Sequence, residues 1–172
     1  MLTPEQCINI LKNAGCNDDV IKHCNVVSEL AVAIAERIES ADVELVRIGG
    51  LLHDLGRAKT HGIGHAVEGV KIAHELELHG EIIGIIRNHI GAGLPANEAV
   101  AIGLPEEDFI PETIEQKIVA HADNLVDYFK PVPVSNIVEE LSKKGHMEAV
   151  KRIQKLHEEL SELAGISIDQ LI

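Results

Sequence analysis

Apolar residues recur at intervals of three and four along most of this 172-residue chain, and that spacing predicts amphipathic helices. Val27, Leu30, Ile34 and Ile38 show the pattern most clearly. No segment alternates between polar and apolar residues as a half-buried strand does, and no internal repeat is present. We therefore expect an all-α fold, a bundle of about seven to nine helices.

Capping residues, glycines and prolines mark where the helices should begin and end. The expected helices cover residues 4–13, 18–40, 42–56, 65–79, 81–89, 97–102, 113–129, 135–144 and 146–164. The length suits a single domain over residues 1–172 with one core. We expect the helices within residues 135–164 to pack on that core, and a homodimer contact is the alternative.

The composition excludes several classes of function. Only Phe109, Tyr128 and Phe129 are aromatic, so stacking platforms for single-stranded nucleic acid are scarce. The net charge of −13 would repel a phosphate backbone, which argues against a nucleic-acid polymer as a partner. The sequence shows neither the pattern of a signal peptide nor an apolar run of about 18 residues. We therefore expect a cytoplasmic protein with no membrane partner.

The ten histidines are a surplus for a chain of this length. Four of them, together with two aspartates, lie on or beside the apolar stripes, where polar side chains are rare. These residues are His23, His53, Asp54, His65, His89 and Asp123. A buried carboxylate without a partner costs several kcal/mol, and a buried imidazole needs both of its nitrogens satisfied. A shared metal site accounts for all six, because a divalent cation stabilises buried carboxylates and takes neutral imidazoles as ligands.

The order of four of these residues matches a known signature. His23, the adjacent pair His53-Asp54 and the later Asp123 resemble the H…HD…D pattern of the HD-domain metal-dependent phosphohydrolase superfamily. The resemblance extends over roughly residues 20–130, and it implies that this part of the chain forms the helical HD core.

Two further histidines resemble one branch of that superfamily. His65, which begins an expected helix, and His89 are similar to the next metal-binding histidines of the branch with an HDIG motif. His89 is followed by Ile90, whereas many relatives have two adjacent histidines, and this difference argues against a site for three ions. Arg57 also stands where the family usually has a lysine.

The resemblance implies a set of metal ligands. His23, His53, Asp54 and Asp123 would hold one divalent cation. If the two histidines of the HDIG branch complete a second site, Asp54 would bridge the two ions. We expect two ions, with a mononuclear site as the alternative. Mixed nitrogen and oxygen ligands suit Mn²⁺, Fe²⁺, Co²⁺, Ni²⁺ or Mg²⁺ better than a closed structural zinc site does.

The resemblance also implies an activity, the hydrolysis of a small phosphoester. The substrate would be a monoester or a diester, such as a nucleotide or a related phosphometabolite, attacked by a metal-activated hydroxide that Asp54 helps to hold. Charge on the phosphoryl oxygens needs cationic or hydrogen-bonding groups. Arg57, Lys59 and His61 lie in the loop after the HD pair and are the candidates, although each could instead be a solvated loop residue.

Two other functions stay open on the sequence alone. A related branch of the superfamily contains di-iron oxygenases with much the same ligand set, and a non-catalytic nucleotide or metal sensor could keep the fold. The redox state of the bound metal and the dependence of turnover on oxygen separate the oxygenase from the hydrolase. The sequence does not identify the substrate.

Overall fold

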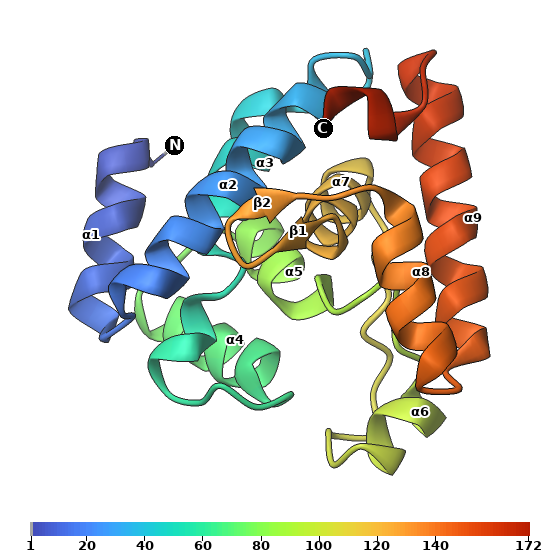
Figure 1. Cartoon of the computed structure of the whole chain (residues 1–172). Helices are drawn as coiled ribbons and strands as arrows, with labels where there is room; N and C mark the ends of the chain where they lie inside the picture. Colours follow the sequence, from blue (N-terminus) through green and yellow to red (C-terminus); the bar gives the residue numbers. More distant parts are fainter. Residues whose placement is uncertain (1) are drawn as a thin grey trace.

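The computed structural model describes residues 2–172 of the chain. This part contains nine α-helices, two short 3₁₀ helices and one small hairpin, so the expectation of an all-α fold is confirmed (Figure 1). In chain order the elements are α1 (Pro4–Ala14), α2 (Asp18–Ala35), α3 (Val43–Leu52), η1 (Leu55–Ala58), α4 (His65–Glu75), α5 (Gly80–Asn88), α6 (Ala96–Ala101), α7 (Ile114–Asn124), β1 (Val126–Asp127), β2 (Lys130–Pro131), α8 (Val134–Lys143), α9 (Met147–Ala164) and η2 (Ile168–Leu171).

Local sequence signals set several helix starts. The Thr3 hydroxyl accepts a hydrogen bond from the Gln6 backbone N–H, and the Gln6 side chain accepts one from the Thr3 N–H, which makes a capping box. Asp42 and Thr113 cap α3 and α7, each by accepting one backbone hydrogen bond. These side chains satisfy N–H groups that the first helical turn leaves without partners, so the three helices begin close to where the sequence predicts.

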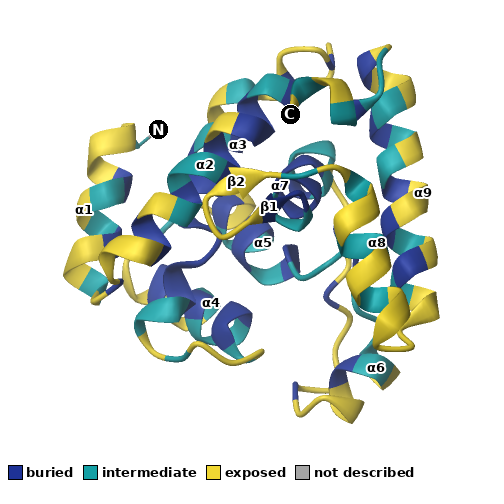
Figure 2. Cartoon of the chain, in the orientation of Figure 1, coloured by how far each residue is buried: buried dark blue, intermediate teal, exposed yellow. Residues whose placement is uncertain are grey.

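The core is built around α2 and α3, which pack closely and turn their buried faces inward (Figure 2). A Cβ atom added at Gly50 would lie 2.7 Å from the Cα of Ser28, so only glycine permits this approach. The Ser28 hydroxyl donates a 2.8 Å hydrogen bond to the Arg47 carbonyl across the same contact. Helices α5 and α7 pack against this pair, and the side chains between them are mainly aliphatic.

Four helices end at least four residues earlier than the sequence predicts. They end at Ala35, Leu52, Glu75 and Asn124 rather than at residues 40, 56, 79 and 129. At the end of α4 the Leu78 N–H donates to the Ala73 carbonyl, and Glu77 has a φ of 52°. This is a Schellman motif with glutamate in the left-handed conformation that glycine usually supplies. The sequence pattern therefore favoured Gly80 as the end of the helix.

After α7 the chain forms a hairpin where the sequence predicted more helix. Strands β1 and β2 pair antiparallel, with Val126 opposite Pro131. The Val132 N–H donates a 2.7 Å hydrogen bond to the Leu125 carbonyl, so this carbonyl is satisfied without another helical turn. Pro131 has no N–H to donate to a helix, which also favours the hairpin.

The C-terminal helix α9 packs on α7. Lys117 Nζ lies 2.7 Å from Glu159 Oε1, and His121 Nε2 lies 3.0 Å from His157 Nδ1. Helix α8 packs against α9 and buries none of its own residues fully. Among the helices of residues 2–172, none combines the length and the apolar character needed to cross a membrane.

Candidate metal centre

The six polar residues that the sequence places near apolar stripes meet at one point in the fold. They come from five separate places in the chain: α2 supplies His23, the adjacent pair His53-Asp54 joins the end of α3 to the start of η1, and the starts or ends of other helices supply His65 (α4), His89 (α5) and Asp123 (α7). The structure thus brings together the whole set. Their role as metal ligands stays a prediction.

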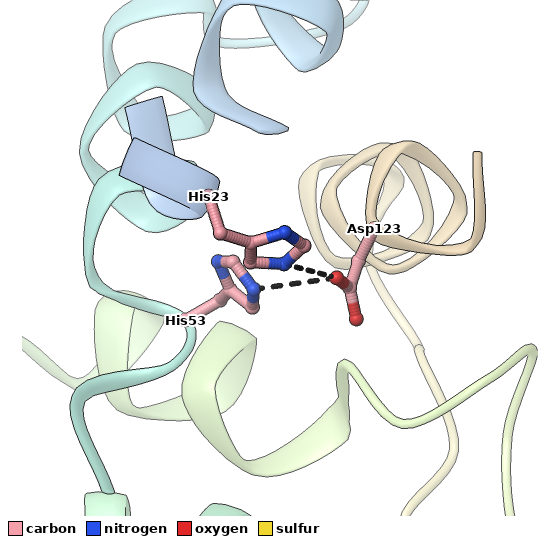
Figure 3. A group of neighbouring side chains, drawn as sticks. All are labelled: His23, His53 and Asp123. Carbon is pink, nitrogen blue, oxygen red and sulfur yellow. Dashed lines mark hydrogen bonds and ion pairs between the residues drawn. The ribbon is translucent and has the colours of Figure 1, made fainter. Parts of the chain in front are cut away.

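His23, His53 and Asp123 form the first half of the centre (Figure 3). Asp123 Oδ1 lies 2.9 Å from His23 Nε2 and 3.5 Å from His53 Nε2. Figure 3 shows both imidazole rings directed at this one carboxylate oxygen from different helices. Three ligand atoms of this kind within a few ångströms make a site that could hold a cation.

Asp54, His65 and His89 form the second half. Asp54 Oδ1 lies 3.3 Å from His65 Nε2 and 3.6 Å from His89 Nε2. The other oxygen of Asp54, Oδ2, lies 3.7 Å from His53 Nε2, on the side of the first half. Asp54 therefore presents one oxygen to each half, which is the arrangement that a bridging carboxylate requires.

Backbone carbonyls orient all four imidazoles in the same way. Each Nδ1 donates to a carbonyl at 2.8–2.9 Å, and three of the four acceptors lie three residues before the histidine. The acceptors are the carbonyls of Tyr128 for His23, Gly50 for His53, Gly62 for His65 and Ile86 for His89. Because a carbonyl can only accept, each neutral ring keeps its hydrogen on Nδ1 and presents the lone pair of Nε2 to the centre.

This arrangement fits a metal ion. His53 Nε2 is fully buried and has no hydrogen-bond partner among the described residues, which is rare for a buried nitrogen. His65 Nε2 and His89 Nε2 lie 2.9 Å apart, so two neutral rings would bring two lone pairs together. A cation between the nitrogens and the carboxylates would satisfy all of these atoms at once.

The electrostatics of the centre favour positive charge. Burial would lower the pKa of His53, but the carboxylates of Asp54 and Asp123 raise it to about 9. Burial would raise the pKa of both aspartates, yet the neighbouring histidines, His53 first, hold those values well below the usual range. Burial together with the nearby His89 lowers the pKa of His65 to about 4. Without a cation, the two ionised carboxylates would draw a proton onto Nε2 of His53, and a divalent cation in the same field would take the place of that proton.

A glycine explains how the two chain segments of the second half come together. A Cβ atom at Gly56 would collide with the carbonyl oxygen of His65 and with the backbone nitrogen of Gly69. The backbone of η1 therefore touches the first turns of α4, and this contact holds Asp54 close to His65. Any larger residue at position 56 would push the two apart.

The loop after the HD pair contributes one side chain to the centre. Arg57 Nε lies 3.1 Å from both carboxylate oxygens of Asp54, and Arg57 Nη1 donates to the His61 carbonyl at 2.6 Å. The side chains of Lys59 and His61 form no hydrogen bond or ion pair with the six residues in the described part of the chain, whereas Arg57 does. Lys59 instead lines a cavity of about 490 Å³ together with Glu68 and residues 103–105. Of the three loop candidates, the structure brings only Arg57 to the centre.

The centre is most exposed at His23 and Asp123, and these two residues mark its open side. The side chains of His53 and His89 are 0% and 1% exposed, whereas those of His23 and Asp123 are 19% and 24% exposed. The hairpin of residues 126–131 contacts α2 and α7, the two helices that carry the more exposed pair. A small molecule would therefore reach the centre past His23 and Asp123.

Tyr128 plays a part in the centre that its place in the sequence does not predict. Its carbonyl is the only one of the four histidine anchors that is distant in sequence, and it lies in a segment expected to be helical. Pro131 and Pro133 were the available signal, because they mark an end to the helix before residue 131. They do not reveal that the turn would reach back to α2.

The family of the chain follows from a comparison with known domains. Residues 20–128 match the family described as the HD domain. The chain belongs to the HD-domain metal-dependent phosphohydrolase superfamily. All six clustered residues lie within the matched span, whereas α8 and α9 lie outside it.

Several proteins are similar to this HD-domain chain over most of its length. Protein MJ0778 of Methanocaldococcus jannaschii is 45% identical over 166 residues, which cover 92% of this chain and 97% of that protein. The tRNA (cytidine(56)-2'-O)-methyltransferase of Thermoplasma volcanium is 44% identical over 165 residues, 96% of this chain but 48% of the enzyme. The chain thus spans about half the length of that methyltransferase.

A solved structure shares the fold. The HD domain of the Listeria monocytogenes phosphodiesterase PgpH, in complex with cyclic-di-AMP, superposes with a TM-score of 0.58. The match covers 93% of this chain and 96% of the other at 18% sequence identity. It therefore includes the C-terminal helices outside the span of the HD-domain match.

Proposed function

We propose that this HD-domain protein is a metal-dependent phosphohydrolase that acts on a small phosphoester, a nucleotide or a related phosphometabolite. The observation that carries the proposal is the convergence of four Nε2 lone pairs and two carboxylates on one point. His23, His53, Asp54 and Asp123 would hold one divalent cation. His65 and His89 would hold a second one together with Asp54.

The bound cations would supply Lewis acidity at the phosphoryl group and a hydroxide nucleophile at neutral pH. The chain's own residues do the positioning. The four backbone carbonyls hold the imidazoles in one orientation before any ligand arrives, so little rearrangement accompanies binding.

Arg57 is the residue that we propose would bind the negatively charged phosphoryl oxygens of the substrate. Its Nε holds Asp54 and its Nη1 holds the loop carbonyl of His61, while Nη2 has no hydrogen bond within residues 2–172. The side chain is 28% exposed, so those hydrogens can reach an incoming phosphoryl oxygen. Arginine suits this task because its planar group donates several hydrogen bonds in fixed directions.

The setting of the centre supports a small substrate. The net charge of −13 disfavours a long phosphate backbone, and most of the side chains of the centre are nearly or fully buried. The related PgpH domain was solved with cyclic-di-AMP, which is a compact phosphorylated molecule. The charge of the chain and the burial of the centre do not distinguish a phosphomonoester from a phosphodiester.

The experiment is an activity screen run beside elemental analysis. The purified chain is loaded with Mn²⁺, Ni²⁺, Co²⁺, Fe²⁺ or Mg²⁺ in turn and offered phosphomonoesters and phosphodiesters. We expect hydrolysis with at least one cation and about two bound ions per chain. Oxygen-dependent turnover with iron and no hydrolysis would favour an oxygenase, and metal binding without any turnover would favour a sensor.

A double variant tests the site itself. His53→Ala with Asp54→Ala should lose both the cations and the activity, because it removes ligands of both halves. The matched control is His74→Ala with Glu75→Ala, an adjacent pair that lies exposed on α4. Undiminished metal binding in the first variant would refute the proposed site.

A further inference from the structure

The hairpin beside the metal centre carries two exposed aromatic residues. Tyr128 is 80% exposed and Phe129 is 41% exposed, and their ring centroids lie 6.4 Å apart with an angle of 63° between the rings. The only other aromatic residue among phenylalanines, tyrosines and tryptophans is Phe109, which is buried. Two of the three residues of these types are thus exposed to solvent, side by side in one tight turn.

This turn is joined directly to the centre. The Tyr128 carbonyl accepts the Nδ1 hydrogen of His23 at 2.9 Å, so the Tyr128 backbone is one hydrogen bond from an expected metal ligand. Lys22 Nζ lies 5.9 Å from the centroid of the Phe129 ring. Figure 1 shows the hairpin beside α2 and α7, the helices that border the open side of the centre.

The fold alone does not call for tyrosine at this position. Tyr128 has a φ of 53°, a left-handed conformation that glycine, asparagine and aspartate adopt far more readily. Its side chain gains little from burial, because most of it is exposed. An asparagine or glycine would form the same turn with less strain and no exposed ring. A ligand that contacts the ring would explain both features.

We propose that Tyr128 determines specificity by stacking its ring on an aromatic base of the substrate. This inference rests on the proposed phosphohydrolase function and narrows its substrate to the nucleotides. The phosphoryl group would lie at the open side of the centre, next to His23 and Asp123. The base, which is joined to it through the sugar, would then lie over the hairpin. Aromatic side chains stack on bases with little dependence on base identity, so the preference is for a base over none.

The first test uses the intrinsic fluorescence of the protein. The chain has one tyrosine and no tryptophan, so excitation near the tyrosine band reports on Tyr128 alone. The Mn²⁺-loaded protein sets the baseline, and AMP or ribose 5-phosphate is then added to it. We expect saturable quenching with AMP and none with ribose 5-phosphate. Equal responses to the two ligands, or no response to AMP, would overturn the stacking.

The second test compares matched substrates that differ only in the base. The pairs are AMP with ribose 5-phosphate, and the dinucleotide ApA with its counterpart that lacks one base. The ratio of kcat/KM within a pair should favour the base by about 10-fold or more. Tyr128→Asn should bring this ratio close to one, since asparagine tolerates the left-handed conformation but carries no ring. Tyr128→Phe should keep the ratio, and Met147→Asn on the exposed start of α9 should not change it.

The outcomes separate this inference from the proposed function. If neither member of either pair is hydrolysed but AMP alone quenches Tyr128, the hydrolase proposal fails and the contact with the base stands. If both members are hydrolysed at equal rates, or Tyr128→Asn leaves the ratio unchanged, the hydrolase stands and the stacking is refuted. Measured metal content in each variant shows whether the His23 anchor has survived the substitution.

Discussion

The molecule contains two histidine pairs of similar geometry in very different surroundings. His65 and His89 have ring centroids 4.9 Å apart, and His121 and His157 have centroids 5.2 Å apart. The closest ring nitrogens lie 2.9 Å apart in the first pair and 3.0 Å apart in the second. Within residues 2–172, only the first pair has a carboxylate within 4.0 Å, that of Asp54.

The difference lies in which nitrogens face each other. In the first pair both Nδ1 atoms donate to carbonyls, so two Nε2 lone pairs meet and need a cation or a proton between them. In the second pair Nε2 of His121 faces Nδ1 of His157, and one neutral ring can simply donate to the other. A metal centre is therefore indicated by the anchoring of the far nitrogens and by the nearby carboxylate, and close histidines alone do not indicate one.

Among the substitutions that distinguish the two pairs, Asp54→Asn should cause the largest loss of metal affinity and activity. The substitution keeps the shape of the side chain but removes the negative charge that both halves of the centre share. We expect metal affinity and kcat/KM to fall by more than about 100-fold. Elemental analysis after dialysis and assays at fixed Mn²⁺ measure the two losses. Asp18→Asn, at an exposed position, is the control, and retention of two ions by the Asp54 variant would contradict the bridging role.

His89→Ala should break the first pair while sparing the other half of the centre. His23, His53 and Asp123 lie together without His89, so one cation should remain where the proposal gives the native chain two. We expect kcat/KM to fall by at least about 10-fold. The metal-to-protein ratio from elemental analysis measures how many cations the variant retains. A ratio of zero, or one that stays at two, would mean that the two halves are not separate sites.

The sequence was sufficient for the fold class and for the members of the cluster. Helical spacing showed that His23 and Asp123 lie on faces that turn inward, and adjacent His53 and Asp54 completed a known signature. The contacts of the loop residues could not be predicted, because Arg57 and Lys59 are both cations in a polar loop. Only the folded 3₁₀ turn of η1 directs one of them to Asp54 and the other away.

The hairpin shows a second limit of sequence analysis. The apolar residues after Asp123 continue a helical spacing. Whether they form a helix or a hairpin depends on which N–H group donates a hydrogen bond to the Leu125 carbonyl. That donor comes from Val132, beyond the turn, so the decision is made by a contact that no local pattern contains. The anchor that Tyr128 provides for His23 depends on this decision.

Acid should lower the free energy of unfolding of the protein because His121, in the second pair, resists protonation in the folded state. Burial, with a smaller effect from His157, lowers the pKa of His121 from 6.5 to about 3 in the folded chain. Between these values the unfolded chain binds one proton more than the folded chain does, so stability falls as the pH decreases below about 6.5. From pH 7 to pH 5 the native protein should lose about 2 kcal/mol relative to His121→Leu.

Urea unfolding of the two proteins at matched metal concentration measures this difference. His157 from α9 faces His121, and the ion pair of Lys117 with Glu159 spans the same two helices, so both must stay unchanged in the comparison. The replacement His74→Leu, at an exposed position on α4, controls for the loss of a histidine. If the free energy of unfolding of the native and His121→Leu proteins changes equally between pH 7 and pH 5, His121 takes up its proton in the folded state and the prediction is wrong.

His157→Ala should have the smallest effect and should complete the contrast with His89→Ala. It removes a partly exposed partner of one hydrogen bond, so the free energy of unfolding should fall by about 1 kcal/mol. The metal-to-protein ratio and kcat/KM should stay at the native values, because neither nitrogen of this pair faces a carboxylate of the centre. A loss of metal on this substitution would mean that the two pairs are coupled through α7, which carries both His121 and Asp123.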